Sequence, residues 1–204
     1  MKKILLSIVA VLMAAPSFAQ FSSGGFELDK ESVYYGVRFG ATFASINGDI
    51  SIGSKAGISL GGVIGLRLSD TTPVFLESGL YYIQRGAKNS DYEITHNNLE
   101  IPLIVKYGFQ VSDDIALLPF IGPYFAYGVS TDEKLKSDYA KAHNIRVNRN
   151  NMGFKLGCGA EYNKLYLEVG YQIGITNIID DEFEAGKDQS SHNNALFINI
   201  GVNF

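Results

Sequence analysis

Residues 195–204, ALFINIGVNF, alternate strictly between two kinds of side chain. One face carries large apolar residues only, namely Leu196, Ile198, Ile200, Val202 and Phe204. The other face carries Ala195, Phe197, Asn199, Gly201 and Asn203. A period of two is typical of a strand with one apolar face, and a tilted strand needs about 9–11 residues to cross a bilayer. The stretch therefore predicts a membrane-spanning strand, and the final Phe204 is interpreted as the terminal signal that the barrel assembly machinery reads.

Seven earlier segments repeat this alternation, at 33–44, 57–68, 74–87, 98–109, 115–130, 152–162 and 165–176. Short turns between them alternate with longer polar connectors at 45–56, 88–97, 131–151 and 177–194. Short turns on one rim and long loops on the other are typical of outer-membrane barrels, whose turns are periplasmic. The sequence predicts an all-β fold over residues 33–204: an eight-stranded antiparallel up-and-down transmembrane β-barrel with both termini in the periplasm.

The alternation alone also fits a soluble secreted barrel that binds an apolar ligand inside. Two properties of the polar face favour the membrane barrel: it is rich in glycine, as a narrow lumen requires, and its charges nearly balance. Those charges are Arg38, Arg67, Arg85, Lys106 and Lys155 against Glu77, Glu100, Glu161 and Glu168. Because unpaired buried charge is costly, we expect these nine residues to form a structural charge cluster that plugs the lumen.

The first 19 residues have the form of a secretory signal peptide. Lys2 and Lys3 precede an apolar run at 4–15, and Ser17 and Ala19 are the small residues of a cleavage site after Ala19. The alternative, a membrane anchor helix, needs a longer apolar run of about 20 residues. Residues 20–32 are expected to form a flexible leader. Loss of two lysines takes the net charge from −4 to −6, which argues against a nucleic-acid partner.

Four stretches resemble recurring segments of the PorT-like outer-membrane β-barrel family. They are 82–88 (YIQRGAK), 98–107 (NLEIPLIVKY), 122–128 (GPYFAYG) and 170–177 (GYQIGITN), and the resemblance covers roughly residues 35–204. It implies an eight-stranded barrel in the outer membrane of a Gram-negative cell. Through the founding member of the family it also implies a link to protein secretion, but it brings no catalytic residues with it.

Candidate chemistry is confined to the predicted outer loops, which hold His96, His143 and His192. A hydrolase at the rim would need a nucleophile and a base within hydrogen-bond reach, and no two histidines have a metal-ligand spacing. The acidic run at 180–184 could bind a divalent cation but lacks EF-hand spacing. The single cysteine, Cys158, excludes an internal disulfide and is expected to face lipid.

We therefore expect a non-enzymatic outer-membrane barrel without cofactor or metal. Its expected partners are outer-membrane lipid, the barrel assembly machinery and an unidentified protein of secretion or envelope maintenance. The alternatives are a hydrolase at the rim and the soluble ligand-binding barrel.

Overall fold

A computed structural model describes residues 33–48, 52–69, 71–88, 92–112, 114–135, 149–176 and 191–204. In these ranges the chain forms nine strands: β1 (Val33–Gly48), β2 (Ile52–Arg67), β3 (Val74–Lys88), β4 (Tyr92–Tyr107), β5 (Phe109–Ser112), β6 (Ile115–Leu135), β7 (Asn150–Tyr162), β8 (Leu165–Gly174) and β9 (Ser191–Asn203). Within them, no helix has the length and apolarity to cross a membrane.

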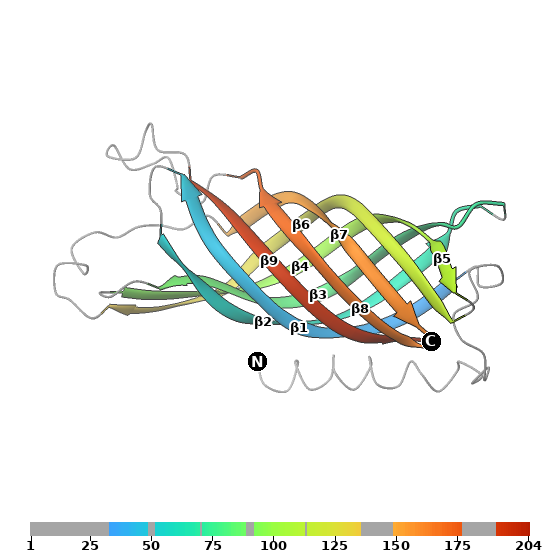
Figure 1. Cartoon of the computed structure of the whole chain (residues 1–204). Helices are drawn as coiled ribbons and strands as arrows, with labels where there is room; N and C mark the ends of the chain where they lie inside the picture. Colours follow the sequence, from blue (N-terminus) through green and yellow to red (C-terminus); the bar gives the residue numbers. More distant parts are fainter. Residues whose placement is uncertain are drawn as a thin grey trace, which may run out of the picture.

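Eight of the strands form the wall of a closed barrel, which Figure 1 shows from the side. All pairings are antiparallel; β1 pairs with β9 to close the sheet, and β4 pairs with β6. The short strand β5 continues β4 beyond Gly108 and pairs with β6 only. The predicted eight-stranded antiparallel barrel is therefore confirmed.

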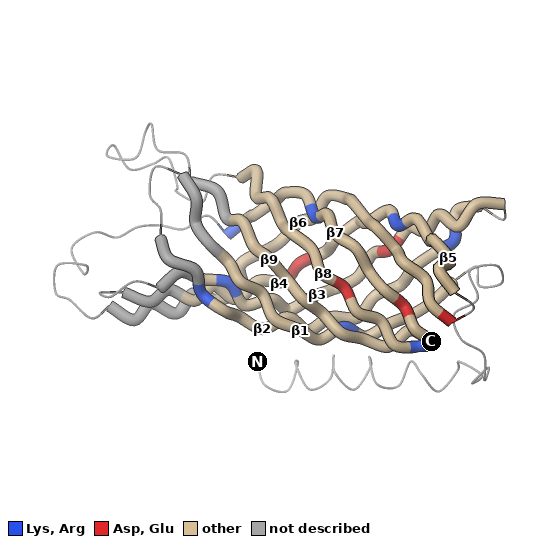
Figure 2. The backbone as a smooth tube through the Cα atoms, viewed as in Figure 1, with Lys and Arg blue, Asp and Glu red and all other residues tan. Residues whose placement is uncertain are grey.

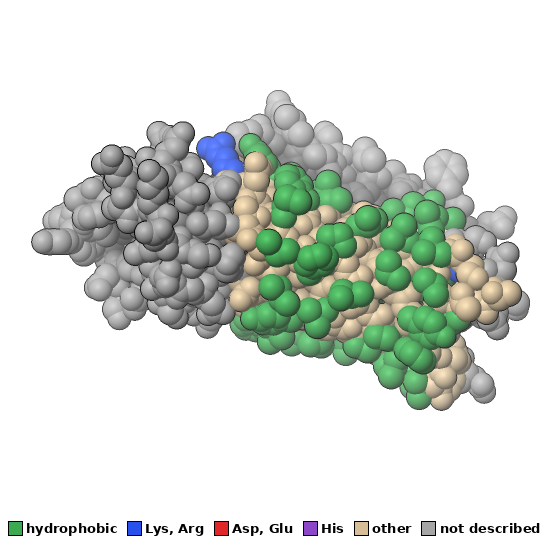
Figure 3. Space-filling view, turned by 90° about the horizontal axis from the view of Figure 1, so that it is seen from above, with side chains coloured by type: hydrophobic (Ala, Val, Ile, Leu, Met, Phe, Trp, Pro, Cys, Tyr) green, Lys and Arg blue, Asp and Glu red, His purple; other side chains and the backbone are tan. Residues whose placement is uncertain are grey.

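Side chains alternate between the lumen and the outer surface along each strand. In β8 the residues alternate between exposed and buried throughout, beginning with exposed Leu165 and buried Tyr166. The outer surface is a broad apolar band (Figure 3), and the buried positions hold most of the charge. This orientation excludes the alternative of a soluble barrel with an apolar interior.

The height of the apolar band fits a bilayer. In β1 the exposed positions run from Val33 to Phe43, about 33 Å along a strand at roughly 3.3 Å per residue. At the usual strand tilt of about 40° this length covers roughly 25 Å of membrane thickness, the height of the apolar band in outer-membrane barrels.

The strands extend further than the sequence pattern predicts. β1 ends at Gly48, β2 begins at Ile52, β4 begins at Tyr92, β6 ends at Leu135 and β9 begins at Ser191, all inside segments predicted as loops. The predictions of loops at 45–56 and 88–97 are therefore wrong over most of their length. Outside the bilayer the backbone ladder continues without an apolar face, as in the pair Thr95 and Asp132, so the alternation that marks a membrane strand ends before the strand does.

Glycines on the inner face allow close packing of the wall and of the lumen. A Cβ atom at Gly122 would lie 2.0 Å from the carbonyl oxygen of Leu103 on the neighbouring strand β4. At Gly159 it would lie 2.2 Å from the hydroxyl oxygen of Tyr166. A side chain at Gly122 would displace the neighbouring strand, and one at Gly159 would displace the Tyr166 ring. The absence of a Cβ atom at these glycines therefore leaves space for the larger neighbours.

Candidate functional site in the barrel lumen

Eight of the nine charged residues predicted for the lumen lie buried inside the barrel. Each is at most 5 % exposed, and they are Arg38, Glu77, Arg85, Glu100, Lys106, Lys155, Glu161 and Glu168. They come from β1, β3, β4, β7 and β8, and Figure 2 marks the positions of charged residues along the strands. Four cations face four carboxylates, and the buried set has no net formal charge.

The first group of contacts, the Glu77 cluster, comprises Glu77, Lys106, Arg38, Tyr34 and Tyr166. Oε2 of Glu77 accepts hydrogen bonds from Lys106 Nζ and from the Tyr34 hydroxyl, both at 2.7 Å. Arg38 Nη2 lies 3.6 Å from the same oxygen. Lys106 Nζ also donates to the Tyr166 hydroxyl at 2.8 Å. The Glu77 cluster thus links β1, β3, β4 and β8 across the lumen.

The second group, the Glu100 cluster, comprises Glu100, Arg85, Lys155 and Gln172. Glu100 forms an ion pair with Arg85 and accepts a hydrogen bond from Lys155 Nζ at 2.8 Å. Gln172 donates to Glu100 at 3.0 Å and accepts from Arg85 Nη2 at 2.6 Å. The Glu100 cluster links β3, β4, β7 and β8. Gln172 is not among the predicted site residues, although its position on β8, in phase with Glu168, marks it as inward-facing.

Two carboxylates are held by side-chain amides of the last strand. Asn199 donates to Glu168 at 2.7 Å, and Asn203 donates to Glu161 at 2.9 Å. Asn203 also accepts a hydrogen bond from Arg38 at 2.6 Å. The polar face of residues 195–204 contained both asparagines, but no sequence signal identified their partners.

Aromatic rings cover the buried cations. Arg38 lies 4.0 Å from the ring centroid of Tyr166, and Arg85 lies 5.2 Å from that of Tyr124. Lys155 lies 4.7 Å from the ring centroid of Phe197. Such contacts attract a cation to the face of the ring, more strongly where water is excluded. The rings therefore fill space around the two clusters and make attractive contacts with the cations.

Arg67 differs from the other eight predicted residues. It is the last residue of β2, it is only partly buried, and its Nε donates to the carbonyl of Ser69 at 2.7 Å. Its guanidinium lies 5.9 Å from the ring centroid of Phe75. Arg67 therefore belongs to the rim with the short turns, because the strand ends there and its side chain caps the following turn.

The predicted placement of the histidines in outer loops is wrong for two of the three. His96 lies within β4, opposite Arg85 of β3 and Thr131 of β6. His192 lies within β9, opposite Asn47 of β1. His143 and the acidic run at 180–184 lie outside the described residues. Among the described residues, no group of three or more His, Cys, Asp and Glu could hold a metal ion. Cys158 is exposed on the outer face, opposite Val169.

A closed antiparallel barrel with an apolar outer band and charges inside is the architecture of an integral outer-membrane protein. The family model described as outer membrane protein beta-barrel domain matches residues 18–180. The chain belongs to this family. No protein among the curated ones matches it.

Solved barrels share the fold at low sequence identity. Neisserial surface protein A (NspA) and a major outer membrane protein from Thermus thermophilus each give a TM-score of 0.52 at 16 % identity, covering 85 % of this chain and 100 % of theirs. The outer membrane protein OprG from Pseudomonas aeruginosa gives a TM-score of 0.50 at 14 % identity, covering 87 % of this chain and 98 % of its own. These similarities establish the fold and carry no function across.

Proposed function

We propose that the protein is a non-enzymatic outer-membrane scaffold whose closed barrel presents its outer ends to a protein partner. The observation that carries the proposal is the filling of the lumen. Two ion-pair clusters and their aromatic rings cross it from wall to wall, and a cavity between them has a volume of only about 10 Å³, roughly the space for one water molecule. Among the described residues, a lumen filled in this way leaves a transported solute no open route.

The loop side of the barrel supports a role in presentation. β4 and β6 remain paired out to Tyr92 and Leu135, beyond Val129, an exposed apolar residue of β6. The β4–β6 pair therefore forms a stem that rises above the apolar band at this end of the barrel. The segments we propose for partner binding are 136–148, between β6 and β7, and 177–190, between β8 and β9.

The orientation follows from the two rims. The C-terminal Phe204 pairs through its backbone with Tyr35, at the rim that carries the short turn at Asn163 and Lys164. Short turns are periplasmic in outer-membrane barrels, so we infer periplasmic termini, with export directed by a signal peptide at 1–19. The resemblance of four segments to PorT-like barrels favours a partner in secretion or envelope maintenance.

Site-specific cross-linking in the native cell tests the proposal. A photo-reactive residue is placed at 140 or 185 in the loops, and at Thr71 in the opposite turn as the control. We expect one defined protein adduct from the loop positions and none of that mass from Thr71. Adducts with lipid alone from both loop positions would contradict a protein partner.

Two further measurements address the alternatives. Purified protein in a planar bilayer should show no discrete conductance, because the lumen is filled; a steady channel would contradict the closed scaffold. Variants His96→Ala, His143→Ala and His192→Ala test the hydrolase at the rim. A lipid or peptide hydrolase activity that one of them abolishes, with the barrel still folded, would replace the scaffold proposal.

A further inference from the structure

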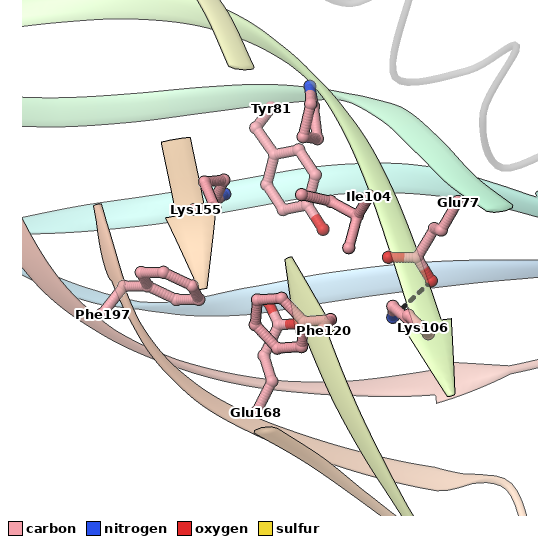
Figure 4. Close-up of a pocket in the computed structure, with 9 residues that line it drawn as sticks. Glu77, Tyr81, Ile104, Lys106, Phe120, Lys155, Glu168 and Phe197 are labelled. Atoms are coloured by element: carbon pink, nitrogen blue, oxygen red, sulfur yellow. Dashed lines mark hydrogen bonds and ion pairs between the residues drawn. The ribbon is translucent and has the colours of Figure 1, made fainter. Parts of the chain in front are cut away.

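A small cavity lies in the middle of the lumen, between the Glu77 cluster and the Glu100 cluster. Figure 4 shows the side chains around it: Glu77 and Lys106 belong to one cluster, Lys155 to the other, and Glu168 comes from β8. Tyr81, Ile104, Phe120 and Phe197 also line it. The four charged residues are between 1 % and 5 % exposed. The wall of the cavity therefore carries four buried charged groups among apolar and aromatic side chains.

Each carboxylate at the cavity has one oxygen left for a further hydrogen bond. The contacts of Glu77 from Lys106, Tyr34 and Arg38 all go to Oε2. Asn199 donates to Oε1 of Glu168. None of these contacts reaches Oε1 of Glu77 or Oε2 of Glu168. These two oxygens can therefore each accept a hydrogen bond from a ligand in the cavity.

The two ammonium groups have the opposite capacity. A lysine ammonium carries three donors. Lys106 uses two of them, toward Glu77 and Tyr166, and Lys155 uses one, toward Glu100. The Tyr81 hydroxyl also points into the space between the labelled residues in Figure 4. A ligand here meets acceptors and donors together, and a water molecule can satisfy both with its two donors and two acceptors.

The charge balance and the volume select the same ligand. Two carboxylates and two ammonium groups leave the wall neutral, so a bound cation or anion would add a buried charge without a counter-charge. The cavity of about 10 Å³ is close to the minimum that holds one water molecule. We propose that this cavity is a binding site for a single water molecule, held by Glu77, Glu168, Lys106 and Lys155. The water joins the two clusters into one hydrogen-bonded network along the lumen, and the inference does not depend on the scaffold role.

Magnetic relaxation dispersion of water on the folded protein in detergent micelles tests the proposal, because it detects water molecules that exchange slowly with the bulk. Ile104→Phe adds volume beside the cavity, and we expect this variant to hold one long-lived water fewer than the wild type. Val63→Ile, which adds a methylene at a lumen position that does not line this cavity, is the matched control and should keep the wild-type number. Equal numbers in wild type and a folded Ile104→Phe would overturn the proposal.

Two measurements on the wild type keep the test decisive if Ile104→Phe does not fold. A methyl-labelled Ile104 should show a nuclear Overhauser contact to a bound water. If this contact is absent, no water molecule occupies the cavity.

The thermal unfolding temperature is also compared in sodium chloride, choline chloride and sodium fluoride at equal ionic strength. A water ligand predicts equal values within error. A rise specific to sodium or to chloride would mean that an ion fills the site.

Discussion

Arg38 of β1 donates a hydrogen bond to Asn203 of β9 at 2.6 Å, across the seam where the first and last strands meet. The same Asn203 side chain donates to Glu161 of β7 at 2.9 Å. The oxygen and the nitrogen of the buried Asn203 side-chain amide are therefore both hydrogen-bonded. The backbone ladder between β1 and β9 closes the seam, and the side-chain hydrogen bonds of Asn203 to Arg38 and Glu161 add to it.

Replacing Asn203 with Ala should weaken this closure. Arg38 and Glu161 would each lose a buried partner, and we expect a loss of about 1–3 kcal/mol in the free energy of unfolding. Urea unfolding of the barrel in micelles measures the change. Thr72→Ala in the exposed turn serves as the control and should unfold as the wild type does. An Asn203→Ala protein with unchanged stability would mean that the backbone ladder alone holds the seam.

Glu100→Leu should destabilise the barrel more severely. The substitution leaves Arg85 and Lys155 buried without the carboxylate that they share, and breaking a buried ion pair in this way costs about 3–5 kcal/mol. We expect a lower unfolding temperature in micelles and a smaller fraction of protein whose gel mobility changes on heating. Unchanged thermal unfolding would contradict the structural role of the Glu100 cluster.

The same cluster offers a rescue that separates charge from packing. The triple variant Glu100→Leu, Arg85→Met, Lys155→Met removes both stranded cations together with the acid. Buried ion pairs replaced by apolar residues of similar volume are often neutral or stabilising, so we expect the triple variant to regain most of the lost stability. A triple variant less stable than Glu100→Leu alone would indicate that the cations stabilise the barrel through contacts other than Glu100, such as those with the aromatic rings.

The strands and their facing could be predicted from the sequence because the bilayer imposes a strict rule on each residue. Every lipid-facing side chain from Leu196 to Val202 has to be apolar, and this produces the period of two. The ends of β4 and β6 could not be predicted, because outside the bilayer only the backbone ladder between residues such as Thr95 and Asp132 holds the strand. That ladder leaves no pattern in the side chains.

The candidate site was predictable as a set of residues but not as a set of contacts. Alternation places Glu77, Glu100 and Lys106 on the inner face, which is a property of each strand alone. Lys106 forms its ion pair with Glu77 and not with Glu100. Which carboxylate it meets depends on the register between strands and on the distance across the lumen. The cavity depends on the same geometry, so no sequence pattern could reveal it.

A pair of glycines in β6 gives a matched test of the inner packing. A Cβ at Gly122 would meet the carbonyl oxygen of Leu103 at 2.0 Å, whereas at Gly128 the nearest atom lies 3.5 Å away. We expect Gly122→Ala to lose about 1–3 kcal/mol through overpacking. Gly128→Ala should be neutral or gain up to about 1 kcal/mol, since alanine restricts the unfolded chain more than glycine. Equal effects in urea unfolding would mean that the wall tolerates added volume at either position.

Phe204 forms two backbone hydrogen bonds with Tyr35 of β1. The backbone N–H of Phe204 donates to the Tyr35 carbonyl at 2.8 Å, and its carbonyl accepts from Tyr35 N–H at 3.2 Å. Deletion of Phe204 removes both hydrogen bonds at the seam and the aromatic end that we propose the assembly machinery reads, so we expect a lower level of folded protein in the outer membrane. Phe204→Tyr keeps the hydrogen bonds and the ring and should assemble normally.

The measurement is the amount of heat-shifted protein in the outer-membrane fraction, compared with the same chain refolded in detergent. If the deletion variant refolds in detergent but is depleted in cells, the defect lies in recognition by the machinery. Normal levels in cells would contradict the role of Phe204 in assembly.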